Sequence, residues 1–241
     1  MTDLVNHQVR LAKRPDAAAT REHWNFTTEP VGQPDDGGVL IKTLSLSLDP
    51  AMRGWLNDAR SYIPPVAIGE VMRAGGIGRV TASKNPSFAV GDTVYGTLGV
   101  QEYMLIPQAD IKRNGLVKID LRAGSIGQWL NVLGMPGMTG YFGLMDVGQP
   151  KEGETVVVSG AAGAVGQTVG QLAKIKGCRV VGIAGGEGAK RVEIPFRPEG
   201  VVLHIGTAGG SLEVGVHVPQ VVVHVIQDHP REVRPLRLKQ V

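Results

Sequence analysis

The stretch VVVSGAAGAVGQ, residues 156–167, joins three consecutive valines to three glycines spaced three residues apart, Gly160, Gly163 and Gly166. The valine run favours a buried strand, and the following GQTVGQLAKIKG continues as a helix. A second valine-rich strand, CRVVGIAGG (178–186), comes next. This order of strand, glycine turn, helix and strand is half of a doubly wound nucleotide-binding unit.

The glycine turn is suited to a pyrophosphate, because backbone N–H groups at a helix N-terminus point at such a ligand and the helix dipole favours negative charge. Side chains would block that approach, which explains the glycines at 163 and 166. Gly166 would also let the helix pack tightly on its strand. The usual first glycine of the fingerprint is Ala161 here, so a tight turn without a ligand is the alternative.

The end of the second strand indicates which dinucleotide would bind. A carboxylate about 20 residues after the turn would bind the ribose 2′-hydroxyl and repel a 2′-phosphate. The strand ends instead in Ala184-Gly185-Gly186, and Lys190 and Arg191 follow, where they could pair with a phosphate. The carboxylate of Glu187 argues against a 2′-phosphate site here. The alternative for Lys190 and Arg191 is a solvated surface pair without a ligand. On balance the residues favour NADP.

Composition sets outer limits on the function. The 241 residues carry a net charge of +3 and 42% hydrophobic residues, as in a globular protein of one large or two ordinary domains. The absence of a basic cluster with interleaved aromatics disfavours nucleic acid, and no apolar stretch of about 18 residues could span a membrane. Cys178 is the single cysteine, which excludes an intrachain disulfide and a cysteine-based metal cage. We expect a cytoplasmic protein that binds neither nucleic acid nor membrane.

The chain divides into three predicted regions: 1–125, 126–187 and 188–241. The first is predicted to be a compact, barrel-like β domain, because short alternating strands such as VLIKTLSLSL (39–48) are separated by turn residues. The second is predicted to begin with a helix from Met138-Thr139 to Gly148 and to continue into the glycine turn.

The third region, 188–241, is predicted to be an atypical tail. Its segment LEVGVHV (212–218) alternates like a strand, but no helical period follows to supply the crossover helices of a parallel sheet. The valine runs are expected to pair as an irregular hairpin and to leave the sheet incomplete, with an unpaired edge.

Four segments resemble a known family. LSLDPAMRGWL (46–56), LGMPGMTGYFGL (133–144), VVVSGAAGAVGQTVGQLAKIKGC (156–178) and VVGIAGG (180–186) are similar to the zinc-independent medium-chain dehydrogenase/reductases. Within that family they resemble the NADP-dependent double-bond reductases, the group of the leukotriene B4 dehydrogenases, prostaglandin reductases and bacterial curcumin reductases. The resemblance implies an α/β fold with a β-rich part: a GroES-like N-terminal domain, and a Rossmann domain that is incomplete here.

The resemblance also implies an activity and a site. Hydride would pass from NADP(H) to the C=C bond of a small-molecule enone or enal, and the full-length family would form homodimers. No catalytic residue is assigned. The residues implied for the cofactor are Gly163, Ala164, Val165 and Gly166 at the pyrophosphate, Lys190 at the 2′-phosphate, and Pro50, Met135 and Thr139 on the nicotinamide side.

Departures from the family pattern leave alternatives open. Ala51 stands where the family has the tyrosine of Asp-Pro-Tyr-Met-Arg. Arg53 of the same motif is expected to be a structural ion-pair partner. The cysteine and histidine set that binds a catalytic zinc is missing. A frameshift near Gly186 is a hypothesis that accounts for the tail. The alternatives are a non-catalytic remnant with weak or no nucleotide binding, and a quinone oxidoreductase, which would keep the glycine turn but not LGMPGMTGYFGL.

Overall fold

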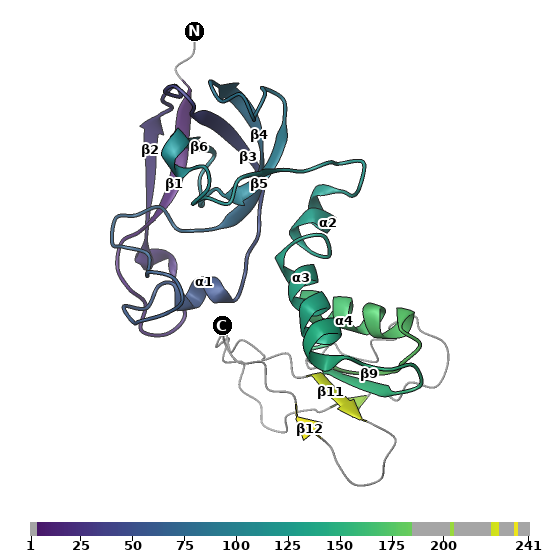
Figure 1. Cartoon of the computed structure of the whole chain (residues 1–241). Helices are drawn as coiled ribbons and strands as arrows, with labels where there is room; N and C mark the ends of the chain where they lie inside the picture. Colours follow the sequence, from purple (N-terminus) through teal and green to yellow (C-terminus); the bar gives the residue numbers. More distant parts are fainter. Residues whose placement is uncertain (1–3, 185–202, 205–222, 227–233, 236–241) are drawn as a thin grey trace. The chain divides into compact units, whose positions relative to one another are not determined.

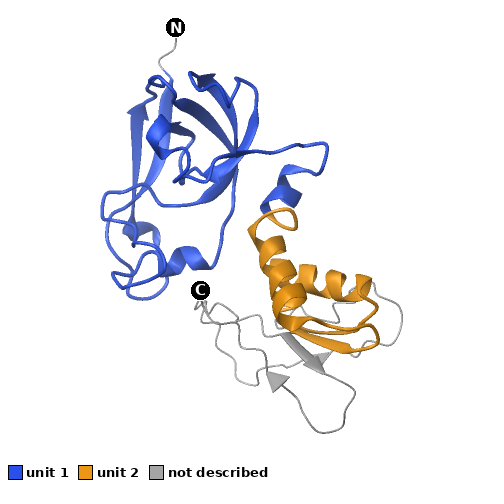
Figure 2. Cartoon of the chain, in the orientation of Figure 1, with its two compact units in different colours: residues 1–130, 214–216 blue, residues 131–213, 217–241 orange. Residues whose placement is uncertain are grey.

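The computed structural model describes residues 4–184, 203–204, 223–226 and 234–235 (Figure 1). Two compact units divide them (Figure 2). Unit 1 comprises residues 4–130, and unit 2 comprises residues 131–184 with the three short later segments. The three-region division made from the sequence stays a prediction.

Unit 1 is β-rich, as the sequence predicts. A five-stranded antiparallel sheet has the order β6-β3-β4-β5-β7, and β1 pairs with β2. The strands are β1 (Val5–Leu11), β2 (Trp24–Pro30), β3 (Val39–Leu46), β4 (Gly75–Ser83), β5 (Thr93–Thr97), β6 (Tyr103–Ile106) and β7 (Val117–Lys118). The helical segments are η1 (Arg21–His23), α1 (Ala51–Gly54), η2 (Gln108–Asp110) and α2 (Ile126–Leu130).

The strand predicted over 39–48 is confirmed as β3, but its alternation is not regular. Val39, Leu40 and Ile41 are all buried, because the register with β4 shifts between Leu40 and Ile41. Such a bulge turns two successive side chains toward one face. The buried side chains of β3 then pack with those of Val80, Val94 and other core residues.

Strand β1 joins the two sheets of unit 1. Its Val9 N–H donates to the carbonyl of Val100 (2.9 Å), and the Met72 N–H donates to the carbonyl of Val9 (2.8 Å). Asn6 on the same strand is buried, and its side-chain amide bonds both backbone groups of Tyr103, each at 2.9 Å. The amide therefore acts as an additional rung between β1 and β6.

Unit 2 contains the predicted strand, turn, helix and strand, which are confirmed for residues 155–184. The sheet order is β10-β9-β8-β11-β12. Its elements are α3 (Met135–Phe142), the π-helix η3 (Gly143–Gly148), β8 (Thr155–Ser159), α4 (Ala164–Ile175), β9 (Arg179–Ala184), β10 (Leu203–His204), β11 (Val223–Ile226) and β12 (Arg234–Pro235). The inner face of α4 packs on the valines of β8, and Cys178 is buried among them, as expected.

The helix predicted to start at Met138-Thr139 starts three residues earlier. Gly134 is the N-cap of α3 and Pro136 lies in the first turn, where a missing backbone N–H costs nothing. The predicted end at Gly148 is confirmed, although the last six residues form a π-helix rather than an α-helix.

The prediction that the sheet is left with an unpaired edge is wrong for β8. Strand β11 pairs with β8 in antiparallel orientation, and β12 pairs with β11. Strand β10 extends the other side in parallel with β9. The four residues of β11, Val223–Ile226, are rich in β-branched side chains, which favour a strand but do not fix the direction in which it pairs. The segment 212–218 lies outside the described residues.

Candidate functional site

The glycine turn lies between the end of β8 and the start of α4. Gly160 has a φ of +62°, a left-handed conformation that glycine adopts without strain. The Gly163 N–H donates to the carbonyl of Gly160 (2.9 Å), which closes the turn. The Ala161 N–H donates to the carbonyl of Ile183 (3.0 Å), so the turn is also fixed to β9.

Gly166 sits where the first turn of α4 touches this loop. A Cβ atom built there would overlap the carbonyl oxygen of Gly160 and lie 2.8 Å from Cα of Ala161, and both partners are backbone atoms. Any side chain would push the helix off its strand. The predicted role of Gly166 in tight packing is therefore confirmed.

The N-terminus of α4 is open to an anion. Gly163 is the N-cap, and no side chain caps the helix within the described residues. Ala164, Val165 and Gly166 provide the N–H groups of the first turn, while Gln167 already donates to the carbonyl of Gly163. The first turn holds no carboxylate to repel a phosphate, and Gly163 is exposed. These residues fit a pyrophosphate.

The glycines of LGMPGMTGYFGL bring α3 against α4. A Cβ at Gly140 would lie 3.1 Å from Cγ2 of Thr168 on α4, and one at Gly137 would overlap the carbonyl of Val132. Because α3 packs so closely, its orientation is fixed relative to the glycine turn. Met135 and Thr139 are one helical turn apart and both exposed, and the Thr139 hydroxyl donates to the carbonyl of Met135 (2.8 Å).

Pro50 belongs to unit 1, in the segment LSLDPAMRGWL. It is the N-cap of the short helix α1, and the preceding Asp49 accepts a hydrogen bond from the Ser47 hydroxyl (3.0 Å). Met135 and Thr139 belong to unit 2. The convergence of Pro50, Met135 and Thr139 at a nicotinamide stays a prediction, and Lys190 lies outside the described residues.

Arg53 is a structural residue, but the ion pair expected for it is not found among the described residues. Its Nε donates to the carbonyl of Ala17 (2.9 Å) and one Nη to the carbonyl of Pro15 (3.0 Å). The other Nη donates to Oδ1 of Asn57 (2.6 Å). The planar guanidinium thus ties the 15–17 segment to α1 through neutral oxygens, which suits a fork of several N–H donors.

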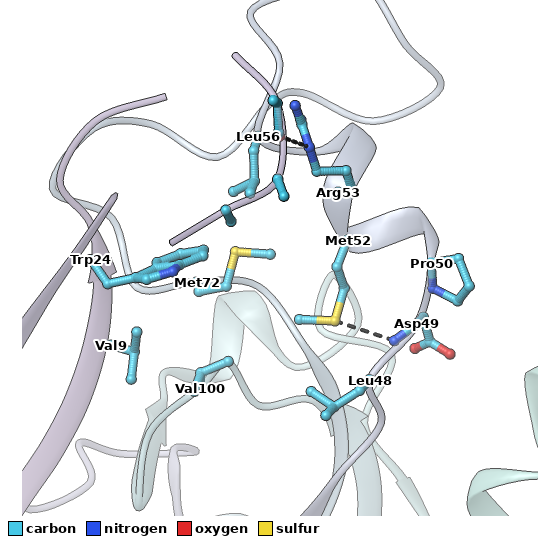
Figure 3. Close-up of a pocket in the computed structure, with 13 residues that line it drawn as sticks. Val9, Trp24, Leu48, Asp49, Pro50, Met52, Arg53, Leu56, Met72 and Val100 are labelled. Atoms are coloured by element: carbon cyan, nitrogen blue, oxygen red, sulfur yellow. Dashed lines mark hydrogen bonds between the residues drawn. The ribbon is translucent and has the colours of Figure 1, made fainter. Parts of the chain in front are cut away.

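A pocket of about 650 Å³ opens in unit 1 beside α1 (Figure 3). Its lining is mostly apolar and includes Trp24, Leu48, Met52, Leu56, Met72 and Val100. The pocket could not be predicted from the sequence, because its lining comes from separate segments that no contiguous motif joins. A usable signal was Met52, two residues after Pro50, because methionine suits irregular apolar cavities.

Other kinds of site find little support in the described part of the chain. No group of three His, Cys, Asp or Glu side chains is close enough there to hold a metal ion. Of the helices in that part, none is both long and apolar enough to cross a bilayer.

Comparisons with known proteins agree on one family. Residues 7–113 match the model of the N-terminal domain of oxidoreductases. The chain is 49% identical over 181 residues to the NADPH-dependent curcumin reductase of Escherichia coli, covering 75% of this chain and 51% of that protein. It is 44% identical over 148 residues to the NADP-dependent 2-alkenal reductase of Nicotiana tabacum, covering 61% and 42%. Over the matched residues, the chain is similar to the double-bond reductase group of the medium-chain dehydrogenase/reductases.

Solved structures show the same similarity and the same fold. The crystal structure of CurA from Vibrio vulnificus in complex with NADPH is 44% identical, with a TM-score of 0.68, and the match covers 75% of this chain and 52% of that one. A quinone oxidoreductase of Pseudomonas syringae, at 22% identity and a TM-score of 0.54, shares the fold. The predicted fold class is confirmed. The chain spans about half the length of the curated relatives it matches.

Proposed function

We propose that this protein binds NADP(H) on the glycine turn and reduces the C=C bond of α,β-unsaturated ketones or aldehydes. The observation that carries the proposal is the open N-terminus of α4, held against the glycine turn by a contact that only a glycine at position 166 permits. The relatives named for NADPH-dependent curcumin reduction and NADP-dependent 2-alkenal reduction support the choice of cofactor and substrate.

The chain's own part in the reaction is binding and orientation. The N–H groups of Ala164, Val165 and Gly166 would hold the pyrophosphate, with Gly163 leaving room for its approach. Lys190 would pair with the 2′-phosphate. NADPH, when bound, supplies the hydride.

The nicotinamide would lie against Pro50, Met135 and Thr139. Ala51 offers no hydroxyl to the enolate that forms, so the hydrogen bond that would stabilise its charge must come from another group. The proposal assigns no proton donor.

The test is titration with NADPH and NADH by calorimetry. Gly163→Val should abolish binding, because a branched side chain would occupy the phosphate's approach. Gly127→Val is the matched control: a Cβ there meets nothing within 4 Å, so NADPH affinity should not change. Unaltered NADPH affinity in a folded Gly163→Val protein would refute the site.

A second titration tests the choice between the two cofactors. Lys190→Ala should narrow the preference for NADPH over NADH, by on the order of 1–3 kcal/mol for a charge-assisted contact. Equal affinities of the unmutated protein for the two cofactors would contradict the proposed 2′-phosphate contact.

A second candidate is a protein that binds nucleotide weakly or not at all and has no activity. The antiparallel pairing of β11 with β8 favours it, since a doubly wound sheet carries a parallel strand at that position. NADPH binding without oxidation by any enone would support this candidate. Oxidation of NADPH by quinones but not by enones would support a function as a quinone oxidoreductase.

A further inference from the structure

We infer that a second copy of this chain packs on the exposed face of α3, so that two chains associate through antiparallel α3 helices. The residues concerned form what is called below the α3 surface, and all of them belong to unit 2 (Figure 2). They are six exposed apolar residues, Val132, Leu133, Met138, Tyr141, Phe142 and Val147. The association requires neither cofactor nor substrate.

Helix α3 buries its smallest residues and exposes its largest. Gly137 and Gly140 are buried, and Gly140 lies against α4. Met138, Tyr141 and Phe142 of the same helix are each about half exposed, at 48%, 48% and 53%. A helix at the surface of a protein normally shows the reverse pattern, with polar residues toward water. The exposed side of α3 therefore has the composition of a buried face.

The segment that contains α3 carries no charge. Between Arg122 and Asp146, no residue is Lys, Arg, His, Asp or Glu. Charged residues are depleted in the cores of protein interfaces, whereas tyrosine, phenylalanine and methionine are enriched there. The rings of Tyr141 and Phe142 also contact each other edge to face, with their centroids 5.4 Å apart. Because this contact restricts both rings, less side-chain entropy is lost when a partner covers them.

The α3 surface is large enough for one side of a dimer interface. Its six residues are between 40% and 53% exposed. At about half of 150–250 Å² for a large side chain, they offer on the order of 500 Å² of apolar area. A dimer interface of standard size buries about 800 Å² per partner, and roughly 60% of that area is apolar. The available apolar area therefore matches what one dimer contact needs.

One charge at the end of this segment favours the antiparallel arrangement. Helix α3 runs directly into the π-helix η3, where Asp146 is exposed. The helix dipole disfavours a carboxylate near a C-terminus and favours one near an N-terminus. Among the described residues, no side chain caps the N-terminus of α3, and its first turn holds no acid. In an antiparallel pair, each Asp146 would lie beside the N-terminus of the other copy's α3, so both helix ends are stabilised.

The same charge pattern favours a second copy over a different protein. Specific recognition of another protein uses charges complementary to its own, and the 123–146 segment carries only Asp146. A two-fold symmetric pair instead uses one surface twice. Met138 and Tyr141 lie near the middle of the stretch from Gly134 to Asp146 and would meet their counterparts close to the two-fold axis. At 3.6 residues per turn, Thr139 is about 160° around the helix from Tyr141, so the residue proposed for the nicotinamide lies outside this surface.

Sedimentation equilibrium of the full chain without NADPH measures the association. The average mass should rise with concentration from that of one chain to that of two. Phe142→Glu should raise the dissociation constant of the dimer at least tenfold, because it buries a carboxylate against apolar side chains. Ile175→Glu is the matched control: Ile175 is 81% exposed on α4 of the same unit but outside the α3 surface, so the constant should not change. A chain that stays monomeric, or equal effects of the two variants, would overturn the inference.

A charge reversal tests the antiparallel arrangement and serves if Phe142→Glu fails to fold. Asp146→Lys places a cation beside the N-terminus of the other copy's α3 and should raise the dissociation constant at least threefold at low salt. Asp58→Lys, at an exposed acid of unit 1, is the control and should leave the constant unchanged. An unchanged constant in Asp146→Lys would refute the antiparallel pairing.

Cysteine cross-linking identifies the surface directly. The native Cys178 is only 3% exposed, so an introduced surface thiol reacts without interference. At least one of Met138→Cys and Tyr141→Cys should form a disulfide between two chains in oxidised glutathione, because facing residues of a close helix pair come within bonding range. Ile175→Cys is the control and should stay unlinked. No disulfide at 138 or 141, or equal linkage at 175, would overturn the inference, and so would a monomer whose thiol at 141 resists maleimide, since the chain itself would then cover the surface.

Discussion

Replacing Gly166 by alanine tests the contact that holds the glycine turn together. The added Cβ would overlap the carbonyl oxygen of Gly160 and lie 2.8 Å from Cα of Ala161. Neither is the movable end of a side chain, so we take the upper part of the range for overpacking, about 3 kcal/mol. Alanine recovers about 1 kcal/mol of helix propensity relative to glycine. The net expectation is a loss of about 2 kcal/mol in the stability of unit 2.

Gly170→Ala, in the same helix, is the matched control. Its Cβ would lie 3.7 Å from Cγ1 of Val180, an ordinary contact, so this variant should gain about 1 kcal/mol from propensity alone. Both substitutions carry the same intrinsic change. Their difference, about 3 kcal/mol, therefore isolates the overlap at Gly166.

Amide hydrogen exchange of β8 and α4 is the assay, because it reports on unit 2 apart from unit 1. A difference of 3 kcal/mol corresponds to roughly a hundredfold difference in exchange rate between the two variants at 25 °C. Similar exchange in Gly166→Ala and Gly170→Ala would refute the argument, because it would mean that the helix can move off its strand at little cost.

Three further substitutions test other contacts. Asn6→Leu leaves both backbone groups of Tyr103 without their side-chain partner and should lower the free energy of unfolding by about 1–3 kcal/mol. Urea unfolding followed by tryptophan fluorescence should then show a lower midpoint, and an unchanged midpoint would contradict this. Gly140→Val should push α3 away from Thr168 and destabilise unit 2 more than Gly140→Ala does. Unfolding followed by far-UV circular dichroism measures this, and equal effects of the two variants would count against close packing. Burial raises the pKa of the Cys178 thiol, so its contribution to stability is complete below the unfolded value of about 8.5 and is lost as pH rises above it. Cys178→Ala should flatten the fall in urea midpoint above that pH, and an identical pH profile would show that the thiol does not contribute.

Local sequence signals were enough for elements whose own residues determine them. The glycine turn was predictable because the valine run, the glycine spacing and the helix all belong to one continuous segment. The start of α3 was not, because Pro136 was compatible with a loop as well as with a first helical turn. The π-helix η3 that follows it, in which Leu144 is buried in the core, was not predicted either, because no sequence period indicates it.

Features that depend on contacts between distant segments could not be predicted from the sequence. Two of the three partners of Arg53 are backbone carbonyl groups, which every residue carries, and the third is the side chain of Asn57, so no carboxylate pattern could indicate them. The pocket is built from segments far apart in the chain. The pairing of β11 with β8 was missed because an alternating valine segment specifies a strand but not the direction or the neighbour of that strand.

The attachment of β1 has a consequence for synthesis of the chain on the ribosome. Asn6 meets Tyr103 across 97 residues of sequence, and Glu102 accepts a hydrogen bond from the backbone of His7 across 95. Strand β1 leaves the ribosome before these partners and must wait for them to emerge, roughly 5–20 s later at ordinary rates of elongation. During that interval β1 can pair with β2 and then with Glu70 and Met72, but its bonds to Glu102 and Tyr103 form among the last steps in the folding of unit 1.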